Sequence, residues 1–378
     1  MTDLEALRRV LFRPFNHGAL HLPNRVVMAP MTRRMSPDNV PGADVAAYYR
    51  RRAENGVGLI ITEGAFVAHP GAGDSDRIPH FHGEPALTGW KAVVDGVHAA
   101  GGAIMPQLWH VGLVAQPGEG ETRGRLTPHQ VGPSGISGGL GIKPYPDGKP
   151  MTTADIEVVA AAFVESAVAA QRLGFDGVEL HGAHGYIFDQ FFWDATNRRK
   201  DGYGGALKER TRFAAEVIRA IKRATGADFP LVLRISQWKQ HDYGARLATT
   251  PAALEQLLLP LVDAGVDLFH CSQRRFWEPE YEGSPINLAG WAQAISGRPS
   301  VTVGSIGLEV DFLSTMLSPQ ASQPGHLDEL ARMMERGDFD LAAVGRALLV
   351  DPGWARKIEQ GRMEDLIPYT PEALATLS

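Results

Sequence analysis

Three residues that could carry chemistry lie close together near the middle of the chain: His181, His184 and Tyr186. Because the histidines are three residues apart, one helical turn would place both imidazoles on the same side. Three interpretations are open. The histidines could bind zinc, or all three side chains could be hydrogen-bonded core residues. Alternatively, two imidazole donors could polarise a substrate carbonyl while Tyr186 supplies a proton. The residues alone favour the last two equally over the metal site.

A second set of polar residues could recognise a flat heteroaromatic ring. Thr32 offers a hydroxyl, Gln107 offers an amide with a donor and an acceptor, and Arg234 offers a cation inside an apolar run. A flavin presents a matching edge of carbonyls and ring nitrogens, and a cation near its pyrimidine end stabilises the reduced anion. For Arg234 taken alone, an ion pair with Glu179 is the simpler explanation.

Two glycine-containing segments near the end of the sequence could bind a phosphate. One segment is Gly304-Ser305-Ile306-Gly307 and the other is Gly345-Arg346. Glycines allow backbone N–H groups to approach an anion, and an arginine adds a bidentate positive charge. The alternative is that the glycines are only turn residues. The combination of glycines with an arginine favours the phosphate site.

These residues follow short apolar runs that recur along the chain. The runs lack alternation of apolar and polar residues, which indicates strands buried on both faces, as in a parallel sheet. They are Val26–Ala29, Leu59–Thr62, Ala103–Leu108, Gly177–Leu180, Leu231–Ile235, Leu268–Cys271, Ser300–Val303 and Leu341–Val344. Helical patterns separate them, at Ala43–Glu54, Ala86–Ala100, Ala154–Leu173, Glu209–Arg223, Pro251–Asp263, Ala289–Ile295, Leu327–Arg336 and Pro352–Gln360.

Eight strand–helix units predict a closed (β/α)8 TIM barrel, whose active site lies at the carboxyl ends of its strands. An open doubly wound sheet is the alternative, but the sequence has no G-x-G-x-x-G fingerprint. We expect one domain over residues 1–378. Two segments exceed a minimal barrel. Phe12–Leu22 predicts a β-hairpin plugging the barrel bottom, and residues 111–150, rich in glycine and proline, predict a lid after the third strand.

The composition excludes several classes of protein. Lys and Arg number 37 and Asp and Glu number 43, so the net charge is −6 and no basic surplus exists for nucleic acid. The single cysteine, Cys271, cannot form an internal disulfide, which favours a reducing compartment. The absence of a signal peptide or a long apolar run predicts a cytoplasmic protein without a membrane partner. A monomer or a homodimer is expected.

Five stretches together resemble the Old Yellow Enzyme family of FMN-dependent ene-reductases. They are Asn24–Arg33, Gln107–His110, Gly174–Ile187, Asn197–Gly205 and Val344–Pro352. The resemblance extends from Leu11 to about Pro352, and Gly174–Ile187 is its most specific part. It implies the barrel, bound FMN, NADPH or NADH as reductant, and a small activated alkene as substrate.

The resemblance also implies roles for individual residues. His181 and His184 would bind the carbonyl oxygen of the alkene, and Tyr186 would protonate the carbon alpha to it. The implied FMN contacts are Thr32 near O4 and N5, Gln107 at the pyrimidine edge, Arg234 near N1 and C2, Pro30 and Met31 along the ring, and Gly304, Ser305, Gly345 and Arg346 at the phosphate.

The loop after the sixth strand departs from common members of the family. We expect its residues Arg275, Phe276 and Trp277 to line the pocket mouth or to pack at its rim. Trp109 and Tyr369 are further candidate substrate contacts. Two other functions stay open: a flavin-binding barrel without ene-reductase turnover, and a metal-dependent hydrolase that uses the two histidines.

Overall fold

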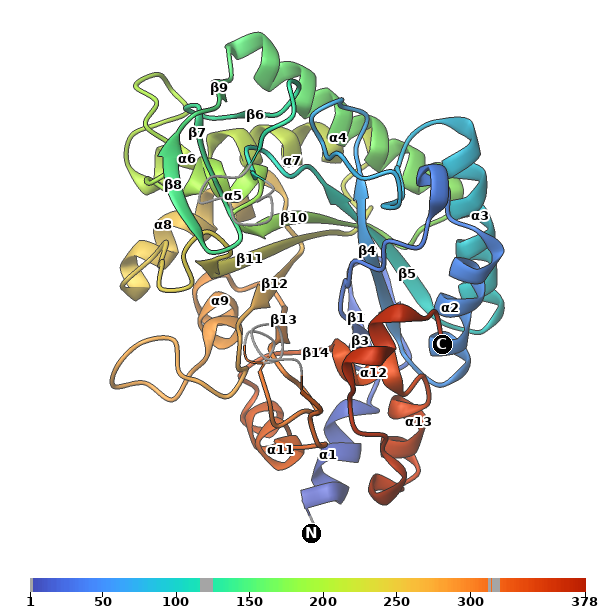
Figure 1. Cartoon of the computed structure of the whole chain (residues 1–378). Coiled ribbons are helices and arrows are strands. Elements are labelled where there is room, and N and C mark those ends of the chain that lie inside the picture. Colours follow the sequence, from blue (N-terminus) through green and yellow to red (C-terminus); the bar gives the residue numbers. More distant parts are fainter. Residues whose placement is uncertain (1–2, 116–124, 312–313, 315–319) are drawn as a thin grey trace.

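The computed structural model describes residues 3–115, 125–311, 314 and 320–378. Eight parallel strands close into a barrel in which the last strand pairs with the first (Figure 1). The strands are β3 (Val26–Met28), β4 (Leu59–Phe66), β5 (Ala103–Trp109), β10 (Val178–His184), β11 (Leu231–Lys239), β12 (Leu268–Ser272), β13 (Ser300–Val303) and β14 (Leu341–Val344). All eight predicted strands are confirmed, and with them the (β/α)8 barrel.

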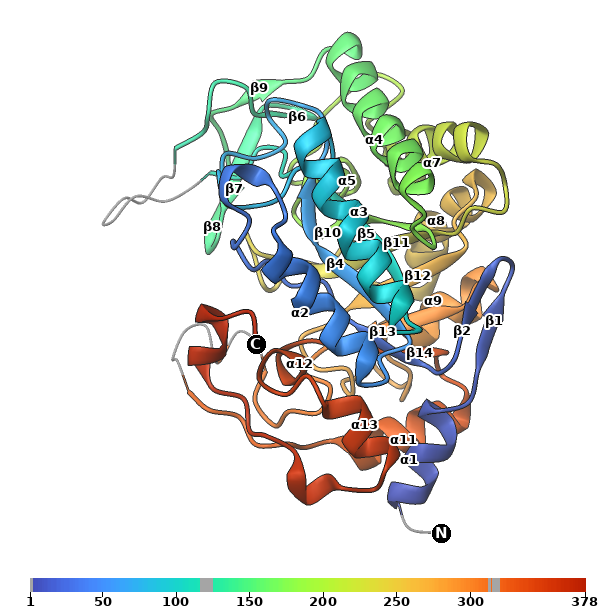
Figure 2. The same ribbon diagram turned by 90° about the vertical axis from the view of Figure 1, so that its right-hand side faces the viewer.

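Helices surround this barrel (Figures 1 and 2). They are α2 (Ala43–Glu54), α3 (Glu84–Ala99), α4 (Thr153–Leu173), α7 (Arg212–Thr225), α8 (Pro251–Ala264), α9 (Leu288–Ser296) and α11 (Leu327–Arg336). The predicted helix over 209–223 is divided into α6 (Leu207–Arg210) and α7, and the one over 352–360 is shortened to α13 (Trp354–Glu359). The sequence did not predict α1 (Asp3–Leu11), α5 (Ile187–Phe192) or α12 (Arg346–Val350).

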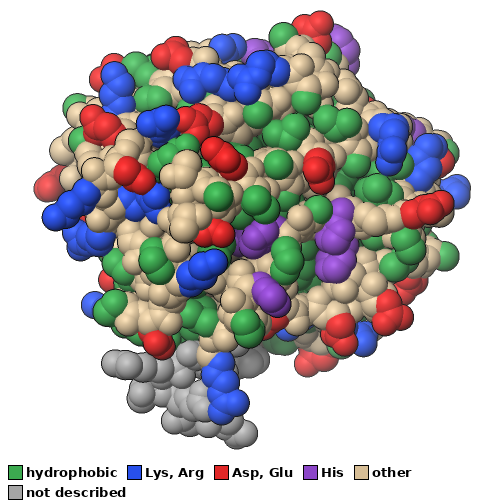
Figure 3. All heavy atoms as spheres, turned by 90° about the horizontal axis from the view of Figure 1, so that it is seen from above, with side chains coloured by type: hydrophobic (Ala, Val, Ile, Leu, Met, Phe, Trp, Pro, Cys, Tyr) green, Lys and Arg blue, Asp and Glu red, His purple; other side chains and the backbone are tan. Residues whose placement is uncertain are grey.

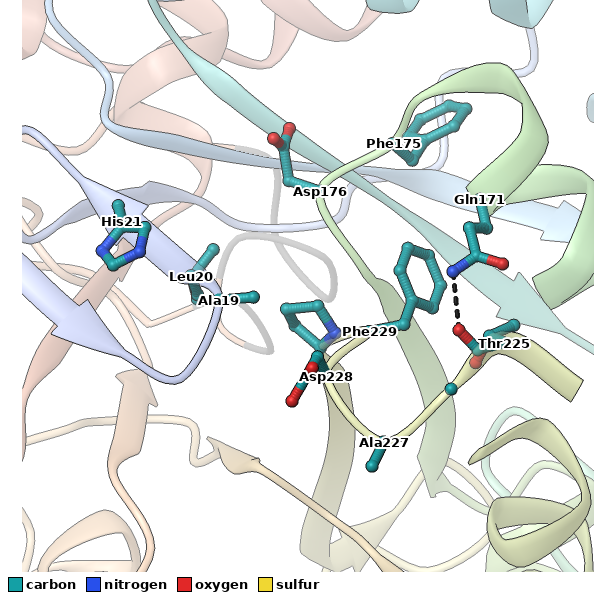
Figure 4. A pocket seen from close by; sticks show the side chains of 12 residues that line it. Ala19, Leu20, His21, Gln171, Phe175, Asp176, Thr225, Ala227, Asp228 and Phe229 are labelled. Atoms are coloured by element: carbon teal, nitrogen blue, oxygen red, sulfur yellow. Dashed lines mark hydrogen bonds between the residues drawn. The ribbon is translucent and has the colours of Figure 1, made fainter. Parts of the chain in front are cut away.

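The predicted hairpin is present as β1 (Phe15–His17) and β2 (Leu20–Leu22), which pair antiparallel. Its residues Phe15, Leu20 and Leu22 share a buried cluster with side chains of seven barrel strands, so the hairpin covers the amino ends of those strands. A pocket of about 450 Å³ lies beside it. Figure 4 shows this pocket, bounded by His21 of the hairpin and by the turns that carry Asp176 and Phe229.

The insertion after β5 contains four short strands. β6 (Val131–Gly132) pairs with β9 (Lys149–Pro150), and β7 (Ile136–Gly139) forms a hairpin with β8 (Ile142–Pro146). The Gly141 N–H donates to the Gln240 carbonyl at 2.8 Å, which joins this hairpin to the end of β11. Positions 116–124 of the predicted lid lie outside the described residues.

The imidazole of His241 lies between the insertion and the turn after β10. His241 is 1% exposed. A Cβ on Gly138 of the hairpin or on Gly185 of the turn would lie 2.2 Å from its ring. Both backbones therefore contact the two sides of one side chain, which is possible only because neither position carries a side chain.

A buried ion pair between Lys239 and Asp189 holds the same turn in place. Lys239 Nζ lies 2.7 Å from Asp189 Oδ1, and both side chains are 0% exposed. The second carboxylate oxygen of Asp189 accepts the Gly185 N–H at 2.7 Å. The end of β11, helix α5 and the turn between β10 and α5 are thus held together by one charged group.

The outer surface carries charges of both signs. On the face in Figure 3, acidic and basic side chains are interspersed. No helix in the described ranges is long and apolar enough to cross a membrane.

Replacing Lys239 by methionine should strongly destabilise the protein, because the Asp189 carboxylate would remain buried without its countercharge. The expected loss in the free energy of unfolding, measured by urea denaturation at pH 7, is about 3–5 kcal/mol. Lys91→Met is the matched control, because Lys91 pairs with Asp95 on the surface of α3. This control should cost no more than about 1 kcal/mol. Equal losses for both variants would contradict the role given to the buried pair.

Candidate active site

A cavity of about 660 Å³ opens at the carboxyl ends of the barrel strands. It brings together every catalytic and cofactor-binding residue that the sequence predicted. These residues are Pro30, Met31, Thr32, Gln107, His181, His184, Tyr186, Arg234, Gly304, Ser305, Gly345 and Arg346. The candidate substrate contacts Trp109 and Tyr369 also line the cavity. Loops far apart in sequence converge here because parallel strands end at the same rim.

The local structure around the two histidines differs from the expected helical turn. Both lie on β10, where residues three apart would normally point to opposite faces of the sheet. A register shift between Gly182 and His184, in the pairing of β10 with β11, removes this alternation. His184 has a φ of +65°, an uncommon conformation for a residue with a side chain. The bulge brings the imidazoles into edge contact, with 5.1 Å between ring centroids.

Burial keeps both imidazoles neutral. It lowers the pKa of His181 and of His184 well below the usual value, and the positive charge of Arg234 lowers both further. The Ala183 N–H donates to His181 Nδ1 at 3.4 Å, so the proton of that ring belongs on Nε2. His181 therefore has one N–H to offer.

His184 is held by two neighbours on β11 and β12. Its Nε2 lies 2.8 Å from Ser272 Oγ, and its ring stacks on Trp238 with centroids 4.4 Å apart. The Trp238 indole N–H in turn donates to the Ser272 carbonyl at 3.1 Å. These contacts fix the orientation of an imidazole on an unusual backbone.

The phenol of Tyr186 lies against the same histidines. Its ring meets His181 and Trp109 edge-on, with centroid distances of 4.7 and 4.9 Å. Burial raises its pKa to about 12, although Gln240 and Arg234 oppose the rise. Tyr186 therefore keeps its proton at neutral pH and can give it up only to a strongly basic group.

Among the described residues, Arg234 makes no hydrogen bond or close ion pair with Glu179, the partner that the simpler explanation required. The oxygens of Glu179 accept hydrogen bonds from Gln107 Nε2 at 2.7 Å and from His270 Nδ1 at 2.6 Å. Arg234 is 7% exposed, and its Nε has no hydrogen-bond partner among the described residues. Glu179 attracts this guanidinium without bonding to it. A buried cation with unused donors fits the electron-rich pyrimidine end of a flavin.

The other end of the cavity fits a phosphate. The Arg346 guanidinium donates to Ser305 Oγ at 3.1 Å and to the Val310 carbonyl at 2.7 Å, which orients it beside Gly345. Gly304 has a φ of +154°, and a Cβ there would lie 2.6 Å from the Gln273 carbonyl oxygen. Glycine is thus required at this bend, and the cavity places one arginine at each end, Arg234 and Arg346, as the ring and the phosphate of FMN require.

The predictions for the loop after β12 were wrong in detail. Its cavity-lining residues are Gln273 and Arg274, not Arg275, Phe276 and Trp277. Arg275 pairs with Glu278 and with Asp311, both at 2.7 Å. Phe276 is fully buried in the core. Trp277 stacks on His326 of a neighbouring loop, which agrees with the alternative expectation of a rim residue.

Sequence reasoning missed several lining residues. They are Leu140, Trp238, Gln240, Tyr243, Ser272, Arg274, Pro371 and Leu374. The Trp238–Tyr243 segment follows a predicted strand and contains two aromatics, a signal that could have identified it. The described residues include no group of three His, Cys, Asp or Glu side chains arranged to hold a metal ion.

Comparisons with known proteins identify the family. The model of the NADH:flavin oxidoreductase / NADH oxidase family matches residues 10–311. Rice (Oryza sativa subsp. japonica) 12-oxophytodienoate reductase 7 is 34% identical over 358 residues, which cover 90% of this chain and 86% of that protein. The NADH oxidase of Thermoanaerobacter brockii is 33% identical over 94% of this chain, but the chain spans only 52% of that relative.

A solved structure agrees with this result. Morphinone reductase in complex with tetrahydroNAD superposes with a TM-score of 0.75 at 27% identity, covering 96% of this chain and 93% of that one. The barrel, the convergent cavity and the matched family model lead to one conclusion: the chain belongs to the Old Yellow Enzyme family of FMN-dependent NADH:flavin oxidoreductases.

Proposed function

We propose that the chain is an ene-reductase that uses NADPH or NADH to reduce a small alkene activated by a carbonyl or nitro group. The observation that carries this proposal is the convergence of two neutral imidazoles and a protonated phenol on the cavity that fits FMN. Relatives with similar sequence or structure are named for the reduction of oxophytodienoate and morphinone, which is consistent with this substrate class.

Residues at both ends of the cavity would hold the cofactor. Arg234 and Gln107 would meet the pyrimidine end, and Thr32 would lie near O4 and N5 of the ring. Gly304, Ser305, Gly345 and Arg346 would bind the phosphate, while Pro30 and Met31 would lie along the ring. When bound, FMN would accept a hydride from the nicotinamide and deliver it to the beta carbon of the alkene.

The imidazoles would bind the oxygen of the activating group. Negative charge grows on that oxygen only as the alkene is reduced, so an N–H aimed at it stabilises the transition state more than the ground state. Both rings are neutral and held in place before the substrate arrives, so little reorganisation is needed. Trp109 and the buried walls of the cavity would exclude water and strengthen these hydrogen bonds.

Tyr186 would complete the reaction by protonating the alpha carbon. Its high pKa keeps the Oη proton in place until the carbon becomes basic enough to take it. The short distances to His181 and Trp109 orient the phenol toward the same substrate. Two other functions are tested against this one: a flavin-binding sensor and a metal-dependent hydrolase.

The first test uses the visible spectrum of the purified protein. The flavin should be reduced anaerobically by NADPH or NADH and reoxidised by cinnamaldehyde, with one saturated aldehyde formed per flavin. A yellow protein whose reduced flavin persists with every enone, enal and nitroalkene would support the sensor instead. Colourless protein that carries stoichiometric zinc would support the hydrolase.

Replacing His181 by alanine should slow the alkene half-reaction more than flavin reduction. The expected loss is about 100- to 1,000-fold, the usual cost of losing one donor to a developing oxyanion. Stopped-flow measurement of each half-reaction gives the two rates separately. Equal slowing of both would remove His181 from this role.

The variant Tyr186→Phe keeps the aromatic ring but lacks the hydroxyl group that would supply the proton. It should leave flavin reduction intact and slow alkene turnover. Undiminished turnover would show that water, rather than Tyr186, supplies the proton.

Replacing Gly304 by alanine should lower FMN content. The new methyl group would collide with the backbone of the loop after β12 and displace the phosphate corner. Gly226→Ala is the control, because Gly226 also has a positive φ of +88° but nothing within 4 Å of its added Cβ. The flavin-to-protein ratio after dialysis is the measurement. Equal retention of FMN in both variants would argue against a phosphate site at Gly304.

A further inference from the structure

The side chains that line the cavity are strongly biased in charge. Four arginines line it, namely Arg33, Arg234, Arg274 and Arg346, and no Asp, Glu or Lys is among the described lining residues. Such a cavity attracts anions. The FMN phosphate accounts for one negative group, so the role of each arginine decides whether a second anion is recognised.

Three of the four arginines have assigned tasks. Arg33 donates to backbone carbonyls of the C-terminal segment, including that of Thr376 at 2.5 Å. Arg346 is held at the candidate phosphate corner by Ser305. Arg234 lies at the candidate pyrimidine end. The fourth lining arginine, Arg274, has no role assigned so far.

Arg274 is a partly exposed cation that lines the cavity. Its side chain has no hydrogen bond or ion pair within the described ranges. The nearby carboxylates of Glu278 and Asp311 are both bound by the adjacent Arg275. The charge of Arg274 acts on Tyr243 instead, where it counteracts the increase in the phenol pKa that burial causes. Arg274 and Tyr243 both line the cavity.

A row of stacked rings connects Tyr243 to His184 at the proposed reaction centre. Trp238 stacks on His184 on one side, at 4.4 Å and an interplanar angle of 26°. Trp238 also stacks on Tyr243, at 5.8 Å and the same angle. His184, Trp238 and Tyr243 all line the cavity, so a molecule whose activating oxygen lies at His184 could extend past Trp238 until its far end reaches Tyr243.

We infer that Arg274 and Tyr243 form an anion-binding subsite, which recognises a carboxylate or phosphate carried by the molecule that lies along Trp238. The guanidinium supplies a charge-assisted pair of donors and the phenol a third O–H. The primary assignment is a carboxylate on a planar conjugated substrate. A phosphate of the nicotinamide reductant is the second source of the same chemistry. This inference rests on the proposed ene-reductase function.

The test compares 4-carboxycinnamaldehyde with its methyl ester, two alkenes that differ only in the charge at the far end. The wild-type protein should reduce the acid with the higher kcat/KM. Arg274→Gln should lower kcat/KM for the acid by about 10- to 100-fold, as expected for a lost hydrogen bond to a charged group, and leave the ester unchanged. Arg275→Gln is the matched control and should leave the preference for the acid intact.

A binding measurement tests the subsite without turnover. 4-Carboxybenzaldehyde and methyl 4-formylbenzoate lack an alkene, and their binding can be followed by quenching of tryptophan fluorescence. The acid should bind more tightly to the wild-type holoenzyme, less so at high salt, and no more tightly than the ester to Arg274→Gln. If the wild type reduces neither cinnamaldehyde, the proposed function fails while this experiment still tests the anion subsite.

Flavin reduction by NADPH and NADH distinguishes the two sources of the anion. A loss in Arg274→Gln confined to this half-reaction assigns the anion to the reductant. A loss confined to the acid substrate assigns it to the alkene. Equal effects on acid and ester with unchanged flavin reduction, or no effect in any arm, would overturn the inference. A fall in FMN content would also overturn it, because Arg274 would then belong to the cofactor phosphate.

Discussion

The site depends on a single irregularity in the barrel wall. A regular β10 would point His181 and His184 to opposite faces, and only the bulge with its left-handed His184 brings them together. A backbone of this kind is unfavourable for a residue with a Cβ, so the surrounding structure must stabilise it. Asp189 binds the next N–H along the chain and is itself held by Lys239. A buried charge pair thus maintains the geometry of two neutral side chains.

Burial explains the combination of neutral donors and a protonated acid. Burial is what lowers the pKa of the histidines and raises that of Tyr186, and the closed barrel provides this burial. Arg234 acts in the same direction on the histidines, because its unpaired charge disfavours a second cation nearby. Under the proposed function, one cation would therefore serve both the cofactor and the protonation state of the side chains that bind the substrate.

The barrel was predictable because its strands are continuous apolar runs with helices between them. The ends of β10 and β11 were not predictable, because their last residues are polar and resemble a loop sequence. Some of these residues line the cavity and others, such as Lys239, bond to buried groups, so a strand can be polar at its carboxyl end without being exposed. The bulge at His184 was equally hidden, because spacing alone could not distinguish it from a helical turn.

The convergence of the candidate cofactor-binding residues on one cavity was predictable, because the carboxyl ends of parallel strands meet at the same rim whatever the loops do. The residues of the loop after β12 that line the cavity could not be predicted in this way. Arg274 lines the cavity, whereas Arg275 forms an ion pair with Asp311 of another loop. The sequence gives no sign of this ion pair. Tyr369 could be identified as an isolated aromatic, but the contribution of Pro371 and Leu374 depends on how the C-terminal segment folds back over the cavity.

The packing of His241 between Gly138 and Gly185 has a consequence for how such sequences can diverge. Any side chain added at either glycine needs the space that the imidazole fills, so a change at one of the three positions demands a change at another. The insertion therefore cannot be exchanged freely for a loop of different shape, even though it lies outside the barrel. Three positions separated by many residues are thus sterically coupled, and the shape of the insertion is tied to that of the turn after β10.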